Sequence, residues 1–294
     1  LLEPPLLYRM MFRRPKIDDD MGESFIHGIG LSEEQEINAP LKHLEGHTLI
    51  AGTTGCGKTV TFRLLITCCV LQGHSILIID PKGDKDLLKA VKEACDIAGR
   101  AEDFIFFHPA HPSKSCRIDP LKNWSRETGI ASRIAPLIPS ETGADAFVAF
   151  CWNAINTIAL NLINIGVRPN LKRIRTYIEG GPEDLLFKVL ESFFRQNVPN
   201  WEQQVKPYVQ EGLTNKYGRL QNPTAPKELL GYMAFYKIHL RQTDPKRYKN
   251  DDIDSLISMV EHSRDHFQKM IASLVPILAM LTAGELGSML SPDV

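Results

Sequence analysis

One short run, residues 52–59, has the composition and spacing of a phosphate-binding loop. It fits the pattern GxxxxGK[ST] at every required position. Glycines let backbone N–H groups turn inward around phosphate oxygens, the Lys58 ammonium supplies a point charge, and the Thr59 hydroxyl can ligate magnesium. We therefore predict binding of ATP with Mg²⁺, with Lys58 also acting in catalysis. The predicted binding residues are Gly52, Thr53, Thr54, Gly55, Cys56, Gly57, Lys58 and Thr59.

A second run, Ile76-Leu77-Ile78-Ile79-Asp80-Pro81-Lys82-Gly83-Asp84, places a carboxylate after an apolar segment. Asp80 would lie at the carboxyl end of a buried strand, where α/β sheets bind ligands. It either holds a magnesium-bound water, which makes it a second candidate catalytic residue, or caps the turn before Pro81. Because no Glu follows it to orient an attacking water, we do not expect it to be the main Walker B acid.

Alternating strand and helix patterns from His47 to Pro109 would position both runs. The predicted helices end at glycines, and the apolar segments between them are typical of strands buried on both faces. This order predicts right-handed crossovers and an α/β fold with a parallel sheet. The predicted strands are 47–51, 75–79 and 104–107, and the predicted helices are 58–72 and 85–98.

Beyond Trp124 the pattern becomes mostly helical. Breaks at Asn222-Pro223 and Asp244-Pro245 separate the segments, and Gly181-Pro182-Glu183-Asp184 opens a helix. We predict three parts: a lead-in over 1–46, the first part of a P-loop α/β domain over 47–124, and a helical accessory domain over 125–294.

The stretch 144–165 is apolar enough to resemble a membrane helix, with Asp145 as its one charge. Its polar residues recur at three- and four-residue spacing on one side, which leaves an apolar face for a protein core. We therefore expect a core helix. The polar residues are Asn153, Asn156, Thr157, Asn161 and Asn164.

Composition is that of an ordinary soluble protein, with 43% hydrophobic and 23% charged residues and a net charge of −1 over 294 residues. Any contact with DNA must therefore come from a local patch or a ring of subunits. The six cysteines show no paired CxxC spacing and indicate reduced thiols in a cytoplasmic compartment. Cys56 is either a small filler or a reactive thiol.

No signal peptide precedes the first predicted strand, and the chain starts at Leu1, as an internal fragment would. Basic residues follow an apolar start that is too short to span a bilayer. They are either the cytoplasmic flank of a membrane segment or a frayed arm. These residues are Arg9, Arg13, Arg14 and Lys16.

Other candidate sites carry weaker signals. His262 and His266 lie one helical turn apart without the Glu of HExxH, and His108 and His111 follow a predicted strand, so we expect neither pair to bind metal. Two basic clusters either contact DNA or a protein bound to it, or are solvated ends of helices. They comprise Lys172, Arg173 and Arg175, and Arg241, Lys246, Arg247 and Lys249 with Tyr248 between them.

Three runs together resemble the TraD/TraG-type coupling proteins of bacterial conjugation, relatives of the FtsK and HerA DNA pumps. They are Gly46-His47-Thr48 leading into the phosphate loop, Asp80-Pro81-Lys82-Gly83-Asp84, and Ile118-Asp119-Pro120-Leu121-Lys122-Asn123-Trp124. The similarity extends from about Ser24 onward. It implies a hexameric ATPase with a RecA-like motor domain and an all-α domain, on the cytoplasmic face of the bacterial inner membrane. Such a protein delivers relaxase-bound, single-stranded DNA to a type IV secretion channel.

One departure and two alternatives stand beside this resemblance. In that family the Walker B acidic pair follows the all-α domain, whereas this sequence stops at Asp293-Val294. We therefore expect the fragment to lack part of the hydrolytic site and the arginine donated by a neighbouring subunit, and to be inactive alone. The alternatives are an FtsK/HerA-type pump without a secretion partner and a non-hydrolysing docking module for a DNA–relaxase substrate.

Overall fold

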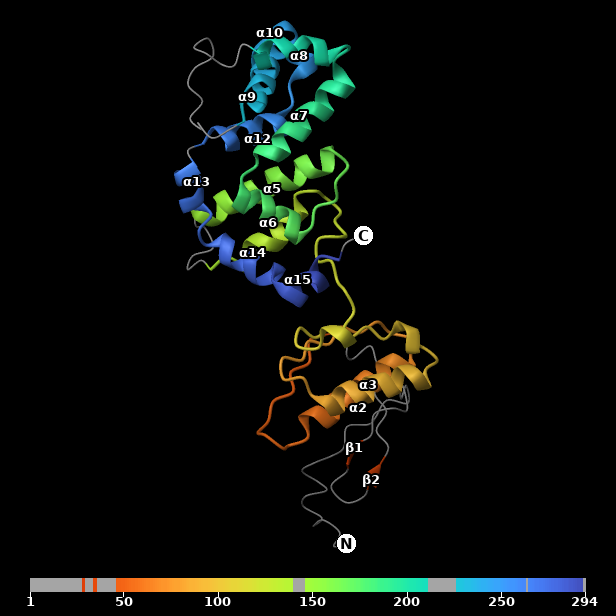
Figure 1. The fold of residues 1–294 in the computed structure, drawn as a ribbon. Coiled ribbons are helices and arrows are strands. Elements are labelled where there is room, and N and C mark those ends of the chain that lie inside the picture. Colours follow the sequence, from red (N-terminus) through yellow and green to blue (C-terminus); the bar gives the residue numbers. More distant parts are fainter. Residues whose placement is uncertain are drawn as a thin grey trace. The chain divides into compact units, whose positions relative to one another are not determined.

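The computed structural model describes residues 28–29, 34–35, 46–139, 146–210, 226–262 and 264–292 (Figure 1). The chain divides into two compact units, Leu1–Ile105 and Phe106–Val294. We call them the phosphate-loop unit and the helical unit. Four predicted features lie outside the described residues: most of the lead-in over 1–46, Asp145, the break at Asn222-Pro223, and Asp293-Val294.

Two packed helices form the described core of the phosphate-loop unit. α2 (Lys58–Leu71) and α3 (Lys85–Ile97) each end near a glycine in the left-handed region, Gly73 (φ 84°) and Gly99 (φ 67°). Both helices and their glycine ends confirm the sequence prediction. A 3₁₀ turn, η2 (Ala101–Asp103), follows α3. The buried residues between α2 and α3 are Ile66, Val70, Ala94 and Cys95.

The predicted α/β fold with a parallel, RecA-like sheet is wrong. Within the described part of the chain, strands are confined to β1 (Gly28–Ile29) and β2 (Glu34–Gln35), which pair antiparallel. The segments 47–51, 75–79 and 104–107 join no sheet. The observed fold of the described residues is predominantly helical.

The apolar segments of the phosphate-loop unit explain this difference. A strand in a parallel sheet needs hydrogen-bonded neighbours and a covering layer on both faces. Here the side chains of Leu49, Leu77 and Ile79 are 91%, 86% and 84% exposed. A run of apolar residues favours burial of a segment, but it does not indicate which other segment pairs with it.

The described part of the helical unit is built from helices (Figure 1). In chain order they are η3 (Pro112–Lys114), α4 (Gly129–Ile134), η4 (Ala135–Leu137), α5 (Ala146–Asn164), α6 (Leu171–Gly180), α7 (Glu183–Asn197), α8 (Trp201–Gln210), α9 (Lys227–Ala234), η5 (Phe235–Leu240), α10 (Arg241–Thr243), α11 (Pro245–Tyr248), α12 (Asp251–Glu261), α13 (Arg264–Met270), α14 (Leu274–Thr282) and α15 (Gly284–Leu290).

α5 is the central helix of this unit, packed against α4, α6, α7, α12 and α13. It is long and apolar enough to cross a membrane by length and composition. Its apolar side contributes to the core, as predicted, and includes the fully buried Ile155 and Ile158. Its polar side packs on α12, because the Asn161 amide donates to the carbonyl of Asp252 (3.1 Å) and Asn164 donates to the Asp252 carboxylate (3.1 Å). These contacts are those of a helix inside a protein core.

An aromatic cluster fills the part of the helical unit built from α7, α8, α9 and η5. The rings of Phe194 and Phe235 meet edge to face with centroids 5.1 Å apart, and Phe187 stacks on Tyr232 at 4.6 Å. η5 is a π-helical turn that continues α9. Such pairs add about 0.5–1.5 kcal/mol each beyond area burial, so this end of the unit is firmly packed.

Candidate functional site

The phosphate loop joins non-helical chain to the first turn of α2, and two glycines set its path. Gly55 (φ 83°) and Gly57 (φ 88°) both adopt the left-handed region. A Cβ at either position would meet no atom within 4 Å, so the backbone angle, and not lack of space, requires glycine. Gly57 is also the N-cap residue of α2.

The Lys58 side chain folds back over this loop. Its ammonium donates to the carbonyl oxygens of Gly52 (2.7 Å) and Thr53 (2.6 Å) and lies 3.8 Å from the Cys56 sulfur. The structure therefore brings together four of the predicted binding residues. Both carbonyl acceptors are neutral, so the positive charge of Lys58 stays uncompensated by any carboxylate in these contacts.

Cys56 and Gly52 are in close contact within the loop. A Cβ built on Gly52 would lie 2.3 Å from the Cys56 sulfur, a separation that real atoms do not adopt. A side chain at Gly52 would therefore displace the Cys56 side chain, whereas Gly55 and Gly57 are required by their own backbone angles. The Cys56 side chain itself is exposed.

The N-terminus of α2 suits an anion. The first N–H groups of a helix lack intrahelical partners and carry a partial positive charge. No side chain caps α2, and its first turn contains no acidic residue. Thr59 is exposed in this turn. These residues fit a triphosphate, with the Thr59 hydroxyl available to ligate magnesium, which would neutralise phosphate charge.

The Asp80 carboxylate makes its hydrogen bonds within its own turn. It accepts the backbone N–H of Lys82 (3.0 Å) and of Asp84 (2.6 Å). The bond from Asp84 N–H is the largest cause that lowers the pKa of Asp80 below its ordinary 3.8, and the N–H groups of Lys82 and Gly83 lower it further. The carboxylate is therefore held ionised as a cap of its turn. Its contribution to magnesium binding stays a prediction.

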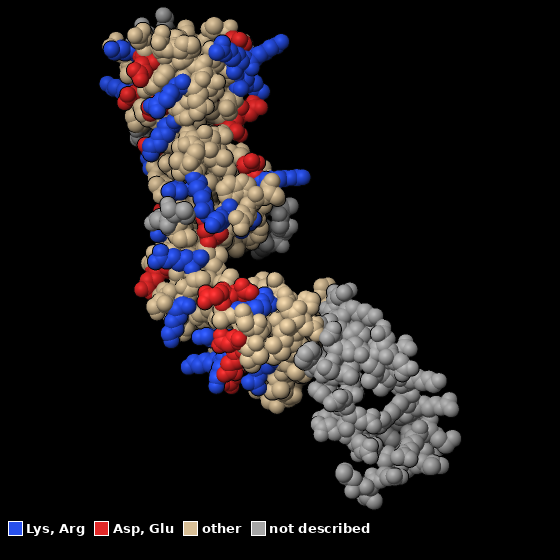
Figure 2. Space-filling model, turned by 90° about the vertical axis from the view of Figure 1, so that its right-hand side faces the viewer, with Lys and Arg blue, Asp and Glu red and all other residues tan. Residues whose placement is uncertain are grey.

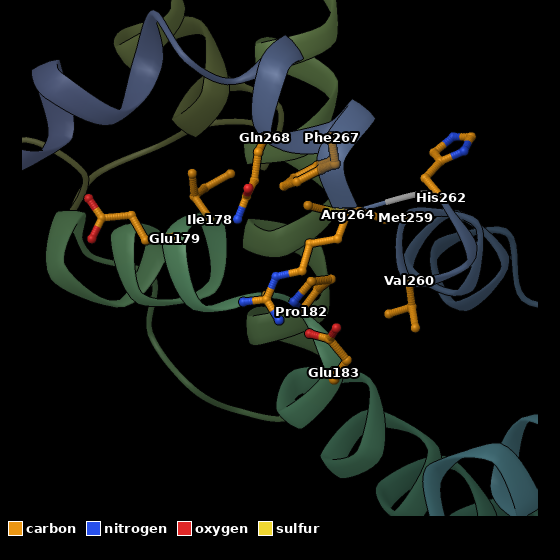
Figure 3. Close-up of a pocket in the computed structure, with 11 residues that line it drawn as sticks. Ile178, Glu179, Pro182, Glu183, Met259, Val260, His262, Arg264, Phe267 and Gln268 are labelled. Atoms are coloured by element: carbon orange, nitrogen blue, oxygen red, sulfur yellow. The ribbon is translucent and has the colours of Figure 1, made fainter. Parts of the chain in front are cut away.

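The two histidine pairs lie in different parts of the helical unit. Groups of three or more potential ligands are lacking throughout the described residues. The rings of His108 and His111 lie 4.8 Å apart, and the ring nitrogen Nδ1 of His108 accepts the Ala110 N–H (3.1 Å). His262 lines a pocket in the helical unit, but its imidazole points away from Arg264 and Glu183 (Figure 3).

Ion pairs neutralise part of both predicted basic clusters. Arg175 pairs with Glu179 (2.8 Å), and Arg241 with Asp254 (2.8 Å). Tyr248 is buried and lies under the Arg247 guanidinium, 5.2 Å from ring centre to charge, so its ring cannot stack on a base. Figure 2 shows basic and acidic side chains interspersed over one face of the molecule, in keeping with the net charge of −1.

The glycine-rich loop, its lysine and the uncapped helix that follows have the arrangement expected of a P-loop. Comparison with known proteins agrees, because residues 27–120 match the family model described as the central domain of helicase HerA. This match places the segment in the FtsK/HerA superfamily of P-loop ATPases. No curated protein and no solved structure gives a significant match.

Proposed function

We propose that this chain is the nucleotide-binding part of an ATPase motor that moves DNA. The observation that carries the proposal is the HerA match, since it includes the whole phosphate loop and the Asp80 turn. The geometry of the loop supports it: positive-φ glycines, an uncapped helix and a lysine whose charge meets only neutral acceptors. ATP with Mg²⁺ is the proposed ligand.

We further propose that the motor is a conjugative coupling protein of the TraD/TraG type. The support is the combination of the phosphate loop with the runs 80–84 and 118–124, which is more specific than the loop alone. In this role a hexamer at the cytoplasmic face of the bacterial inner membrane passes relaxase-bound, single-stranded DNA to a type IV secretion channel. A pump of the FtsK/HerA type without a secretion partner is the competing function.

The roles of the loop residues follow from charge and geometry. The backbone N–H groups at the start of α2 and the Lys58 ammonium stabilise negative charge on the phosphates. To do so, Lys58 exchanges the carbonyls of Gly52 and Thr53 for phosphate oxygens. The Thr59 hydroxyl lies in the same first turn, where it can hold the metal.

The first test is ATP binding by the Lys58→Ala variant. A charge-assisted hydrogen bond contributes about 1.5–3 kcal/mol, so we expect Lys58→Ala to weaken ATP binding roughly tenfold or more. Lys92→Ala is the matched control, because Lys92 is an exposed lysine on α3 outside the loop. Titration calorimetry with Mg-ATP measures both. Equal affinity of parent and Lys58→Ala would overturn the site.

The second part of this test separates the two motor functions. Lys58→Ala is placed in the complete protein in its host, and transfer of DNA from donor to recipient cells is counted. We expect transfer to be abolished while the variant remains folded and present. Normal transfer by the variant contradicts the coupling function. Loss of chromosome maintenance with transfer intact would instead favour a pump without a secretion partner.

A further inference from the structure

Two segments of the helical unit concentrate positive charge that the chain as a whole does not have. Residues 114–133 and 168–173 contain eight basic residues against two acidic ones, Asp119 and Glu127, while the complete chain is nearly neutral. We call these two segments the basic surface. Its basic residues are Lys114, Arg117, Lys122, Arg126, Arg133, Arg168, Lys172 and Arg173.

A buried ion pair holds the two segments together. The Asp119 carboxylate, only 3% exposed, accepts a hydrogen bond from the Arg168 guanidinium and another from the Leu121 N–H (2.9 Å). Arg173 in turn donates to the carbonyl of Arg168 (2.6 Å). The charge of Asp119 is thus neutralised by the ion pair that joins the two segments. Arg173 is held beside this ion pair by its hydrogen bond to the Arg168 carbonyl.

A second arginine fixes the loop that follows Asp119. Arg133 of α4 donates to the carbonyls of Pro120 (2.7 Å) and Asn123. These acceptors, like the Arg168 carbonyl bonded by Arg173, are neutral. Hydrogen bonds to carbonyls orient a guanidinium without cancelling its charge. Arg133 and Arg173 are therefore positioned cations with exposed side chains.

The remaining cations of the surface are exposed, except Lys172, which is partly buried. Arg117, Lys122 and Arg126 are exposed. Over the range that the structure describes, Arg168 is the one member of the surface in an ion pair with a carboxylate. Elsewhere in the helical unit, Lys188, Arg195, Lys237, Arg241 and Lys249 each pair with an acidic side chain. The basic surface differs in this respect from α7, where Lys188 and Arg195 both pair with acidic side chains.

We propose that the basic surface binds the phosphate backbone of DNA. This inference rests on the proposed function and names the part of the chain that contacts its substrate. Fixed guanidiniums and open lysines neutralise phosphates and release counterions, which supplies sequence-independent affinity. Trp124, the aromatic residue within the surface, is partly buried and packs on the core, so the surface offers charge and little base stacking.

The test neutralises the three open cations together. Arg117→Gln/Lys122→Gln/Arg126→Gln is compared with Lys206→Gln/Lys227→Gln/Lys246→Gln, which removes the same charge from exposed lysines of the helical unit. Binding of a labelled single-stranded oligonucleotide and its duplex is measured between 50 and 200 mM salt with the 294-residue chain, without nucleotide. The first variant should weaken binding about tenfold or more and reduce the duplex salt slope by roughly 2–3.

Two further measurements keep this test decisive. Arg117→Lys/Arg126→Lys retains the charges and should retain most of the affinity, and thermal unfolding should match the parent in every variant. ATP affinity should also be unchanged, so a failure of this proposal is distinct from a failure of the phosphate loop. An equal loss in the control triple variant overturns the proposal. So does unchanged DNA affinity accompanied by lost binding of polyglutamate, which would mark an acidic protein as the partner.

Discussion

The two units of the chain differ most in how much apolar surface they bury. In the helical unit, α5 is surrounded by neighbours and its Ile155 and Ile158 are fully buried. In the phosphate-loop unit, the described core consists of four buried residues between α2 and α3, while Leu77 and Ile79 face solvent. Burial of apolar area is the main favourable term in folding. Among the described residues, the helical unit is therefore the more extensively packed part, and the predicted chemistry lies on the less extensively packed one.

This difference also separates the two kinds of binding surface. The phosphate loop depends on backbone angles at Gly55 and Gly57 and on a single ammonium. The basic surface depends on side chains fixed to a packed helical core, with Arg133 and Arg173 held by carbonyls. A loop of the first kind can adjust to its ligand, whereas the basic surface holds part of its charge, that of Arg133 and Arg173, in fixed positions.

The largest expected effect comes from one truncation made in both units. Ile155→Ala in the helical unit should lower the free energy of unfolding by about 4 kcal/mol, because truncation of a fully buried side chain leaves a cavity. The same substitution in the phosphate-loop unit, Ile66→Ala on α2, should lower the free energy of unfolding of that unit by about 2 kcal/mol. Ile66 is 8% exposed in a small core that can relax around the truncated side chain.

All three tryptophans, Trp124, Trp152 and Trp201, lie in the helical unit, so chemical unfolding followed by tryptophan fluorescence reports on that unit. Ile155→Ala should strongly lower the denaturant concentration at the midpoint of this fluorescence transition. Ile66→Ala should leave it nearly unchanged and increase amide exchange in α2 instead. If both variants lower the fluorescence midpoint equally, the units unfold together and the comparison fails.

A smaller effect is expected at the π-turn of the helical unit. The Tyr236 hydroxyl donates to the carbonyl of Asn250 (3.4 Å) and accepts its N–H (3.2 Å), linking η5 to the start of α12. Tyr236→Phe should cost about 1 kcal/mol in unfolding free energy. Burial raises the pKa of Tyr236 to about 12, with the nearby Asp254 charge as a second cause.

The sign of the pH effect follows from that raised pKa. Because the pKa of Tyr236 in the folded protein exceeds its ordinary value of 10.0, the stabilisation is complete below pH 10 and is lost as pH rises toward about 12. Phenolate absorbance during alkaline titration should show a late-titrating component that becomes smaller in Tyr236→Phe, because the pKa of Tyr232 is raised by burial as well. If all tyrosines of the folded protein are ionised by pH 11, burial does not raise the pKa of Tyr236 as described.

The smallest effect concerns Asp80 in the phosphate-loop unit. Its pKa is lowered below 3.8 by the N–H bonds of its turn, so the associated stability is present above pH 3.8 and is lost as pH falls through the folded value. Carboxyl NMR shifts measure this titration, and Asp80→Asn removes the signal and identifies it. A midpoint at or above 3.8 would show that the turn does not form in solution.

Local sequence signals succeeded where neighbouring residues determine the structure. Gly73 and Gly99 end α2 and α3 as predicted, since a left-handed residue closes a helix without distant partners. The parallel sheet failed because strand pairing is decided between segments far apart in sequence. The ion pair of Asp119 and Arg168 could not be predicted for the same reason. The two residues are 49 positions apart, and no local sequence pattern indicates that they pair.

The residues of the phosphate loop were recognisable from spacing alone, but their contacts were not. The pattern GxxxxGK[ST] identifies Lys58 without indicating that its ammonium meets the carbonyls of Gly52 and Thr53. It also does not reveal that the Cys56 sulfur fills the space over Gly52. The uncompensated charge of Arg133 and Arg173 was likewise hidden, because it depends on which acceptors the fold supplies.

The bonds of Lys58 have a consequence for the timing of a nucleotide cycle. In the function that we propose, the ammonium that bonds the carbonyls of Gly52 and Thr53 would also bond the phosphates of a nucleotide, so binding and departure would be exchange reactions. Each departing phosphate would be replaced by a carbonyl already within reach. Such an exchange would lower the barrier to product release, at the expense of some affinity for the nucleotide.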